Sequence, residues 1–456
     1  MGIGLHGGGG AAVRFFAAAG AVVIATDMKT EKELAPSIEK LKDLKNITYV
    51  LGQHRMEDFE NVDLVVKGPA VPWNSKHIQA ALKKKIPVEM DSSIFFKLCK
   101  LPIIGVTGTK GKTTTATLVS EILKTAGKKV FEVGIGQKPV LNVLEEIGEE
   151  RNGSVVFELS SWRLSALGRE GLSPHIAVLT NIHQDHLNYY GTMEKYIADK
   201  EYIFASQKAD DYVVLNYDNE SVRGLADKIK SKIIFFSALK SDLKNCIFIE
   251  KGKINYKRDE ESVEMCDLSD IRLRGGHNLY NILAAAGAAV ADGIAPEKIC
   301  EAVKNFKGVP HRLELVREID GVKYINDTTA TMPDAAIAGI NSFSENIILI
   351  AGGADKNLVF KDFSKAIKEK VKKAILLKGE ATEKIKEELK KIEAENKIDS
   401  EFDSMEKAVI RAKSIAGPGD VVLLSPGAAS FGLFLNEFDR GDKFRQAVGE
   451  LEALEA

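Results

Sequence analysis

The sequence has little net charge and no long apolar run. Its 63 basic and 65 acidic residues leave a formal net charge of −2, so no overall field favours nucleic acid or a membrane surface as a partner. No apolar run reaches the roughly eighteen residues of a membrane span, and no basic segment followed by a long apolar stretch opens the chain. We therefore expect a cytoplasmic monomer whose partners are small molecules, with no nucleic acid and no membrane among them.

Cysteines are also few and widely spaced. They form no CxxC pair, and no histidine stands at a spacing suited to zinc. We interpret them as buried or idle thiols in a reducing compartment. The four are Cys99, Cys246, Cys266 and Cys300.

Residues 101–115, LPIIGVTGTKGKTTT, combine a short apolar segment, a glycine-rich turn and the start of a helical pattern. In a strand, loop and helix of this kind, backbone N–H groups converge on a polyphosphate, Lys112 can reach its outer phosphates, and the Thr113 hydroxyl can hold Mg²⁺. The spacing is one residue longer than the usual pattern between Gly105 and Gly111. We predict an ATP or GTP site here; a chance Gly/Thr-rich turn is the alternative.

The N-terminal segment, residues 1–97, carries a second glycine pattern. Gly2, Gly4 and Gly7 satisfy G-x-G-x-x-G, and Asp27 ends an apolar run further along the chain. This pattern fits a nicotinamide dinucleotide, but the same turn can hold the diphosphate of any nucleotide, including a UDP-sugar. We predict a Rossmann-like domain whose ligand stays open.

The second segment, residues 98–308, alternates apolar runs with helical patterns, as a mostly parallel α/β sheet requires. Glu158 ends one apolar run, and His183 follows another. Because ligands collect at the carboxyl ends of parallel strands, we expect both side chains beside the phosphate loop, in a metal-binding role. Alone, Glu158 could cap a helix and His183 could bond a backbone carbonyl.

The third segment, residues 309–456, repeats this alternation. Its apolar runs GVKYIN, NIILIAGG, KKAILLKG and DVVLLSPG all stop at Gly, Asn or Pro. The predicted fold class is therefore α/β with three domains: a Rossmann-like domain over 1–97, a central P-loop ATPase-type, mostly parallel sheet over 98–308, and a C-terminal Rossmann-like domain over 309–456.

Six motifs together resemble one family, the Mur ligases, and the resemblance covers the whole chain. In order they are TGTKGKTTT from Thr107, ELSSWRL from Glu158, NIHQDHL from Asn181, GGHNLYN from Gly275, VPHRLE from Val309 and INDTTAT from Ile325. The resemblance implies ATP-driven amide synthesis on peptidoglycan precursors. INDTTAT and the closing segment LSPGAASFGLFLNEFDRGDKF are similar to the branch that adds D-glutamate to UDP-N-acetylmuramoyl-L-alanine through an acyl phosphate.

The resemblance also implies roles for individual residues. The catalytic residues would be Lys112, Glu158, His183 and Lys200, with one Mg²⁺ on Thr113 and Glu158 and a second on His183 and a carbamylated Lys200. ATP would contact Gly108, Thr109, Lys110, Gly111, Lys112, Thr113, Thr114, Asn278, Asn281, Arg312 and Asp327. The UDP-sugar would contact Leu5, His6, Asp27, Ser160 and Arg163. D-glutamate would contact Thr331, Lys356, Ser430 and Phe438.

The chain departs from the family pattern mainly where the UDP-sugar should lie: Gly68-Pro69-Ala70 stands where Ser-Pro-Gly is usual, and Gly7 to Gly10 replace a Gly-Lys-Ser-Gly turn. Other departures lie along the rest of the chain. Thr329 stands where a lysine is usual, Gly432 where an aspartate is usual, and Arg163 where a glutamine is usual; Ile135 and Gly136 fall in a stretch that usually reads Asn-Ile-Gly. Three alternatives follow: another Mur or folate-type amino-acid ligase with a different acceptor, a nicotinamide-dependent oxidoreductase, and a non-catalytic nucleotide-binding protein.

Overall fold

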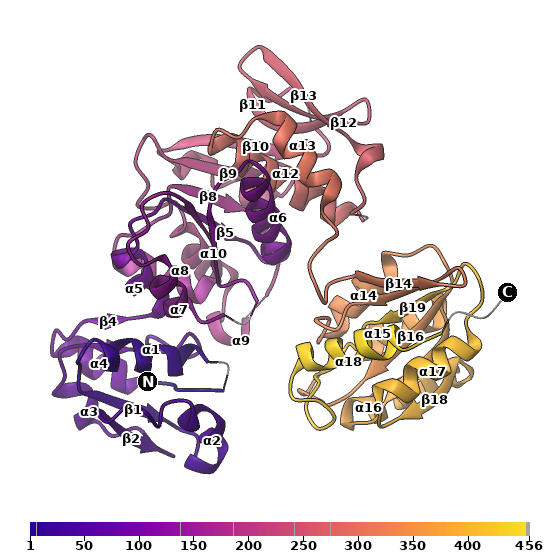
Figure 1. Cartoon of the computed structure of the whole chain (residues 1–456), viewed down its shortest axis with the longest axis horizontal. Coiled ribbons are helices and arrows are strands. Elements are labelled where there is room, and N and C mark those ends of the chain that lie inside the picture. The colour runs from indigo at the N-terminus through magenta and orange to yellow at the C-terminus, as the bar shows by residue number, and fades with distance from the viewer. Residues whose placement is uncertain (6, 137, 186, 241, 274, 453–456) are drawn as a thin grey trace. The chain divides into compact units, whose positions relative to one another are not determined.

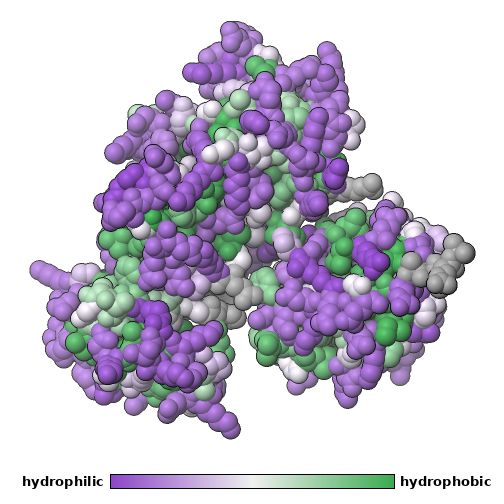
Figure 2. All heavy atoms as spheres, in the orientation of Figure 1, coloured by the Kyte–Doolittle hydropathy of each residue, from purple (hydrophilic) through white to green (hydrophobic). Residues whose placement is uncertain are grey.

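The computed structural model describes residues 1–5, 7–136, 138–185, 187–240, 242–273 and 275–452. The chain forms two compact units, Met1–Phe306 and Lys307–Ala456, which we call unit 1 and unit 2 (Figure 1). Hydrophilic residues cover much of the visible face of each (Figure 2). No helix among the described residues is long and apolar enough to cross a membrane.

The first part of unit 1 contains two small parallel sheets, β1–β2 and β3–β4. The chain's first residues lie between them, because Gly2 N–H donates to Thr26 O of β1 at 2.8 Å and the Met1 amino group donates to Val66 O of β3 at 2.8 Å. The first two residues thus join the two sheets. The elements are α1 Gly8–Ala18, β1 Val23–Asp27, α2 Glu31–Glu39, β2 Ile47–Leu51, α3 Glu57–Glu60, β3 Val65–Val66, α4 Lys76–Lys83, β4 Val88–Glu89 and α5 Asp91–Leu98.

The rest of unit 1 is built on a nine-stranded sheet of order β13-β12-β11-β10-β9-β8-β5-β7-β6. Strands β5 to β11 pair in parallel, and β12 and β13 continue antiparallel. The buried strand β5 lies between β7 and β8, so the segments after these three strands meet at one edge of the sheet.

The strands of this sheet are β5 Ile103–Thr107, β6 Val130–Val133, β7 Ser154–Glu158, β8 Ile176–Leu179, β9 Tyr212–Asn216, β10 Lys232–Ser237, β11 Asn245–Glu250, β12 Lys253–Arg258 and β13 Glu261–Asp267. The helices are α6 Lys112–Thr125, α7 Val140–Ile147, α8 Ser161–Arg169, α9 Leu187–Tyr190, α10 Met193–Glu201, α11 Glu220–Arg223, α12 Gly276–Ala291 and α13 Pro296–Asn305. Helices α12 and α13 both pack against α6.

Unit 2 contains a six-stranded sheet of order β14-β15-β19-β16-β17-β18, parallel except for the β14–β15 hairpin. Strand β16 is buried on both faces, because Ile347 and Leu349 pack into one apolar cluster and Ile348 and Ile350 into another. This two-sided burial explains the continuous apolar run IILIAG. The elements are β14 Glu314–Ile319, β15 Val322–Asn326, α14 Pro333–Asn341, β16 Ile347–Gly352, α15 Lys361–Lys370, β17 Val371–Leu377, α16 Glu380–Lys391, β18 Ile398–Phe402, α17 Met405–Ile415, β19 Val421–Leu424 and α18 Glu437–Gly449.

The predicted α/β class, with a large and mostly parallel central sheet and a second sheet in the C-terminal part, is confirmed. The predicted domain limits at residues 97 and 308 stay a prediction. The segments on both sides of residue 97 lie in the same compact unit.

Candidate active site

The phosphate loop has the predicted layout of strand, glycine turn and helix. Gly108 and Gly111 have φ angles of +151° and +82°, which favour glycine. A Cβ on Gly108 would lie 1.9 Å from Thr180 Oγ1, and one on Gly111 would lie 2.1 Å from Asn281 Oδ1. Both positions therefore need glycine for space as well as for backbone conformation.

The segment after β8 holds the loop in place. Thr109 N–H donates to Asn181 O at 2.8 Å, and Lys110 N–H donates to Asn181 Oδ1 at 2.9 Å. Thr180 Oγ1 donates to Lys110 O at 2.7 Å. Sequence reasoning placed Asn181 at the start of the NIHQDHL motif but gave no site role to Asn181 or Thr180, although their position after a strand beside β5 was a usable signal.

Two lysine side chains converge on one carbonyl group of the loop. Lys112 Nζ lies 3.2 Å from Gly108 O and 3.0 Å from Thr109 O, and Lys200 Nζ lies 2.8 Å from Gly108 O. Lys200 is 1 % exposed. Burial, and then the nearby charge of Lys112, lower the pKa of Lys200 well below its ordinary value. The neutral form of this amine is therefore easier to reach than that of a solvent-exposed lysine.

The predicted metal-binding residues surround the same loop. Thr113 is half-buried in the first turn of α6, and Glu158 ends β7 opposite Val106 of β5. The backbone of His183 is bound to the loop, because His183 N–H donates to Thr109 Oγ1 at 3.0 Å. Within the described part of the chain, no three His, Cys, Asp or Glu side chains cluster as a metal site.

The predicted adenine-site asparagines lie on α12, against the start of α6. Asn278 and Asn281 are 7 % and 5 % exposed, and Asn281 Nδ2 donates to Asn278 Oδ1 at 3.1 Å. Thr115 Oγ1 donates to Asn281 Oδ1 at 3.4 Å. Asn281 therefore touches the phosphate loop and its helix. Thr114 is half-buried in the same first turn of α6.

The predicted UDP-sugar residues fall into two groups. In the first, the Asp27 carboxylate accepts from Gly4 N–H at 3.0 Å, and Leu5 is 50 % exposed. In the second, Ser160 caps α8, and Arg163 Nη2 donates to Asp91 Oδ2 at 3.1 Å. His6 lies outside the described residues.

In unit 2, the predicted nucleotide ligand Arg312 is exposed between two residues of unusual backbone conformation. His311 and Leu313 have φ angles of +67° and +45°. Hydrogen bonds support both: His311 N–H donates to Glu314 Oε2 at 2.8 Å, and Leu313 N–H donates to Asp327 Oδ1 at 3.2 Å. The segment carrying Arg312 is therefore held by contacts on each side of it.

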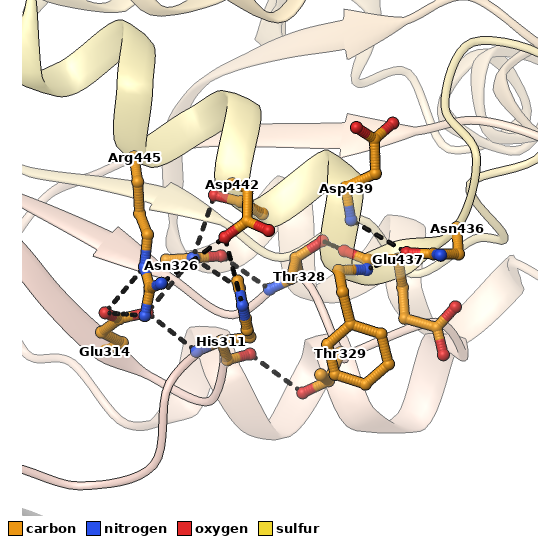
Figure 3. A network of polar contacts seen from close by, with 12 residues as sticks. His311, Glu314, Asn326, Thr328, Thr329, Asn436, Glu437, Asp439, Asp442 and Arg445 are labelled. Atoms are coloured by element: carbon orange, nitrogen blue, oxygen red, sulfur yellow. Dashed lines mark hydrogen bonds and ion pairs between the residues drawn. The ribbon is translucent and has the colours of Figure 1, made fainter. Parts of the chain in front are cut away.

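Figure 3 shows the polar network around this segment. Arg445 of α18 binds Glu314 through Nε at 2.9 Å and through Nη2 at 2.5 Å. Asn326 Nδ2 lies 3.3 Å from Glu314 Oε2 and 3.1 Å from His311 Nδ1, and His311 Nε2 lies 3.5 Å from Asp442 Oδ1. Burial, and then Arg445, lower the pKa of His311. The network ties α18 to the β14–β15 hairpin.

Asp327 is 7 % exposed, and its own chain satisfies both carboxyl oxygens. Oδ2 accepts from Ser425 Oγ at 2.8 Å, and Oδ1 accepts from Leu313 N–H. Burial raises the pKa of Asp327 to about 7. To bind Asp327, a nucleotide ribose would have to replace one of these two hydrogen bonds. The contact between Asp327 and ribose stays a prediction.

The predicted D-glutamate residues of unit 2 lie on segments that follow parallel strands and at the start of α18. The Lys356 side chain is exposed, and its Nζ lies 5.3 Å from the ring centre of Phe431. Phe431 directly follows the buried Ser430 in the chain. Thr331 follows β15, and its N–H donates to Thr329 O at 2.9 Å. The Phe438 ring packs against His311, with ring centres 5.6 Å apart.

Arg440 was missed by sequence reasoning, because nothing in FDRGDKF signals burial. Its side chain is 0 % exposed, and Nη2 and Nη1 donate to Thr328 O and Ala428 O at 2.9 and 3.1 Å. Its Nε also donates to Thr328 Oγ1 at 3.0 Å. Arg440 therefore joins the segment after β15 to the segment after β19, which carry Thr331 and Ser430.

A glycine loop with a converging lysine, between a buried parallel strand and a helix, defines an α/β protein of the phosphate-loop, nucleotide-binding class. Three family models match this chain: "Mur ligase MurD-like, N-terminal domain" over residues 1–89, "Mur ligase middle domain" over 106–289, and "Mur ligase, glutamate ligase domain" over 311–427. The chain belongs to the Mur ligase family. The resemblance inferred from the six motifs, and the predicted enzyme class of ligase, are confirmed.

Curated relatives match over nearly the full length. A protein of Roseiflexus sp. (strain RS-1) named UDP-N-acetylmuramoylalanine--D-glutamate ligase is 44% identical, covering 98% of this chain and 97% of that protein. A protein of Clostridioides difficile (strain 630) with the same name is 39% identical, covering 95% and 94%.

Solved structures share the fold. UDP-N-acetylmuramate-alanine ligase MurC from Thermotoga maritima has a TM-score of 0.60 at 20% identity, covering 98% of both chains. MurF ligase from Thermotoga maritima, solved in complex with ADP, has a TM-score of 0.57 at 17% identity, covering 94% of this chain and 95% of that one.

Proposed function

We propose that this chain uses ATP to join D-glutamate to UDP-N-acetylmuramoyl-L-alanine in peptidoglycan precursor synthesis. The observation that carries ATP chemistry is the convergence of Lys112 and Lys200 on Gly108 O inside the glycine loop. The choice of substrates is supported by the near full-length relatives named for that reaction.

The loop suits a nucleotide triphosphate. With ATP bound, Lys112 would leave its loop carbonyls for the outer phosphates, where its charge offsets the charge that develops on the transferring group. Asn278, Asn281, Arg312 and Asp327 are the proposed contacts to adenine, ribose and phosphate. The backbone from Gly108 to Gly111 supplies N–H donors.

Thr113 and Glu158 offer oxygen ligands, which Mg²⁺ prefers, and phosphate oxygens and water would complete the shell because Mg²⁺ usually takes few protein ligands. Bound Mg²⁺ would supply charge neutralisation at the phosphates. His183 and Lys200 are the proposed ligands of a second ion.

Lys200 suits carbamylation. Its lowered pKa makes the neutral amine easier to reach, and a neutral amine can attack CO₂. A C–N bond forms, one C–O double bond becomes a C–O⁻ single bond, and one of the two amine hydrogens leaves as a proton to solvent. The product exchanges a buried potential cation for an anion. The negative charge of the carbamate would lie beside Lys112 and near the proposed metal ions, and these positive charges would offset it.

The reaction would occur in two steps. The alanyl carboxylate attacks the γ-phosphorus of ATP, giving an acyl phosphate and ADP; the D-glutamate amine then attacks the acyl carbon and phosphate leaves. Lys356 offers a cation for the side-chain carboxylate of D-glutamate, with Thr331, Ser430 and Phe438 as further contacts. Leu5, His6, Asp27, Ser160 and Arg163 are the proposed UDP-sugar contacts.

Phosphate release tests this proposal. The purified chain is assayed with ATP, a panel of UDP-muramoyl precursors, and D- and L-amino acids. We expect turnover with UDP-N-acetylmuramoyl-L-alanine and D-glutamate together, and little without either. Faster turnover with another acceptor or amino acid would contradict the substrate assignment, and saturable NADH binding would favour the oxidoreductase alternative. Size-exclusion chromatography tests the predicted monomer, and the cytoplasmic location stays a prediction.

A further inference from the structure

Two asparagines at the end of β9 bind the segment that follows β8. Strand β8 pairs with β9 in parallel (Figure 1), and the ladder between them ends at Leu179. Beyond it, Asn216 Nδ2 donates to Thr180 O at 2.8 Å. Asn219 Nδ2 donates to Ile182 O at 3.3 Å, and Asn219 Oδ1 accepts from Ile182 N–H at 3.4 Å. Because a carboxamide carries the same donor and acceptor as a peptide group, these side chains take the place of the next rungs of the ladder.

The opposite side of this segment faces the phosphate loop. Asn181 O accepts from Thr109 N–H at 2.8 Å, and His183 N–H donates to Thr109 Oγ1 at 3.0 Å. The backbone of Ile182 therefore binds Asn219, while both of its neighbours bind the loop. The segment is held between the two, as a strand is held between its neighbours in a sheet.

The imidazole of His183 depends on this backbone for its position. The His183 side chain is exposed, whereas Ile182 is 3 % exposed and packs into the apolar core of the large sheet. Thr109 holds the backbone of His183 on one side, and Asn219 holds it through Ile182 on the other. Because buried backbone groups need partners, loss of the Asn219 amide would displace the segment toward water.

We propose that Asn216 and Asn219 are positioning residues for the phosphate loop and for His183. Asn216 acts through Thr180, whose Oγ1 also bonds the loop. Asn219 acts on His183 through Ile182. The inference rests on the proposed function, in which the loop binds ATP and His183 a metal ion. A displacement of about 1 Å at such groups can slow a reaction by about a hundredfold.

Each asparagine also makes a local hydrogen bond, which a purely structural role would explain. Asn219 Oδ1 accepts from Val222 N–H at 3.1 Å and caps α11, and Asn216 Oδ1 accepts from Asp218 N–H at 3.0 Å. A serine hydroxyl can cap a helix and close a similar turn, but it lacks the amide that reaches the segment after β8. The variants Asn219→Ser and Asn216→Ser therefore separate the two roles.

Hydrogen exchange tests these contacts without any substrate. In Asn219→Ser and Asn216→Ser, the peptide of residues 176–185 should exchange about tenfold faster than in the wild type, because one or two hydrogen bonds that hold it are lost. Exchange elsewhere in unit 1 should stay unchanged. Asn255→Ser is the control, at a buried asparagine of β12 whose Nδ2 donates to Lys253 O at 3.0 Å. It should leave exchange of this peptide unchanged.

Turnover tests the consequence for the reaction. In Asn219→Ser, kcat should fall about tenfold or more, while the KM for D-glutamate stays within about twofold, since the proposed contacts of D-glutamate lie in unit 2. Faster exchange throughout unit 1, unchanged exchange of the 176–185 peptide, or faster exchange of that peptide with unchanged kcat would each overturn the positioning role.

The affinity for ATP, measured by calorimetry, gives a readout that needs no ligation. Asn216→Ser should bind ATP about tenfold more weakly than the wild type, because Thr180 no longer holds the loop as firmly. Equal affinity would overturn the role of Asn216 at the loop. A wild type that binds ATP but joins no amino acid would contradict the proposed function alone, and the exchange and affinity results would still decide the role of the two asparagines.

Discussion

Lys200 Nζ donates a 2.8 Å hydrogen bond to Gly108 O, so a side chain from α10 reaches the turn that precedes α6. Lys112 Nζ lies 3.2 Å from the same oxygen. Burial, and then repulsion from the charge of Lys112, lower the pKa of Lys200. The loop is therefore poised to receive negative charge.

Lys200→Ala should remove nearly all turnover, because the variant cannot form the proposed carbamate. Short carboxylates such as formate should restore part of the activity by supplying the missing anion. Carbon-13 bicarbonate should give a carbamate signal in the wild type that the variant lacks. Lys195→Ala, at an exposed lysine of the same helix, is the control. A wild type with full activity after complete removal of CO₂ would count against the carbamate.

Lys112→Ala should reduce turnover by about a thousandfold or more, since it removes the cation nearest the transferring phosphate. Circular dichroism and thermal unfolding should stay close to those of the wild type, because the bonds from Lys112 to Gly108 O and Thr109 O lie within the loop itself. Lys124→Ala, at a lysine in the last turn of the same helix, is the control. Activity within tenfold of the wild type would reject the assigned role.

Gly111→Ala should abolish ATP binding and lower stability, because the new Cβ would lie 2.1 Å from Asn281 Oδ1. Gly127→Ala, just after α6, is the control. Gly127 has a similar φ of +81°, but a Cβ added there has no heavy atom within 4 Å. It should cost only about 1–2 kcal/mol of backbone strain. Calorimetric titration with ATP separates the two effects: equal affinity in the two variants would show that the Asn281 contact is unimportant.

Arg440→Met should destabilise unit 2 by about 3 kcal/mol, since two buried carbonyl oxygens lose their donor. Both tryptophans lie in unit 1, so tryptophan fluorescence would miss the change; hydrogen exchange of unit 2 peptides would detect it. The KM for D-glutamate should rise more than the KM for ATP. Lys443→Met, at a lysine of the same helix that pairs with Asp439, should change neither quantity much.

Asp327 should make unit 2 less stable as pH rises. The folded state keeps the Asp327 proton up to about pH 7, whereas the unfolded chain releases it near pH 4. Folded unit 2 thus binds more protons in that window, and its unfolding free energy should fall by up to about 4 kcal/mol from pH 4 to pH 7. Asp327→Asn should flatten this pH dependence, measured by hydrogen exchange of unit 2 peptides. The control variant Asp320→Asn, at an exposed aspartate, should leave the pH dependence unchanged. A wild-type profile that rises over the window would disprove the assignment.

The sequence alone determined the fold class, the phosphate loop and the family. Those features depend on local patterns: apolar runs that end at glycine, a lysine next to a glycine turn, and motifs in a set order. Local patterns place a residue on a strand, turn or helix, because backbone geometry has a fixed period within each element.

Only the tertiary structure decided which distant side chains meet. Local pattern does not reveal that Asn281 closes over Gly111, or that Arg440 is fully buried between two loops. These contacts form when helices pack onto a sheet whose strand order differs from chain order. The neighbours of a side chain are then set by long-range packing, which the periodicity of a single segment does not encode.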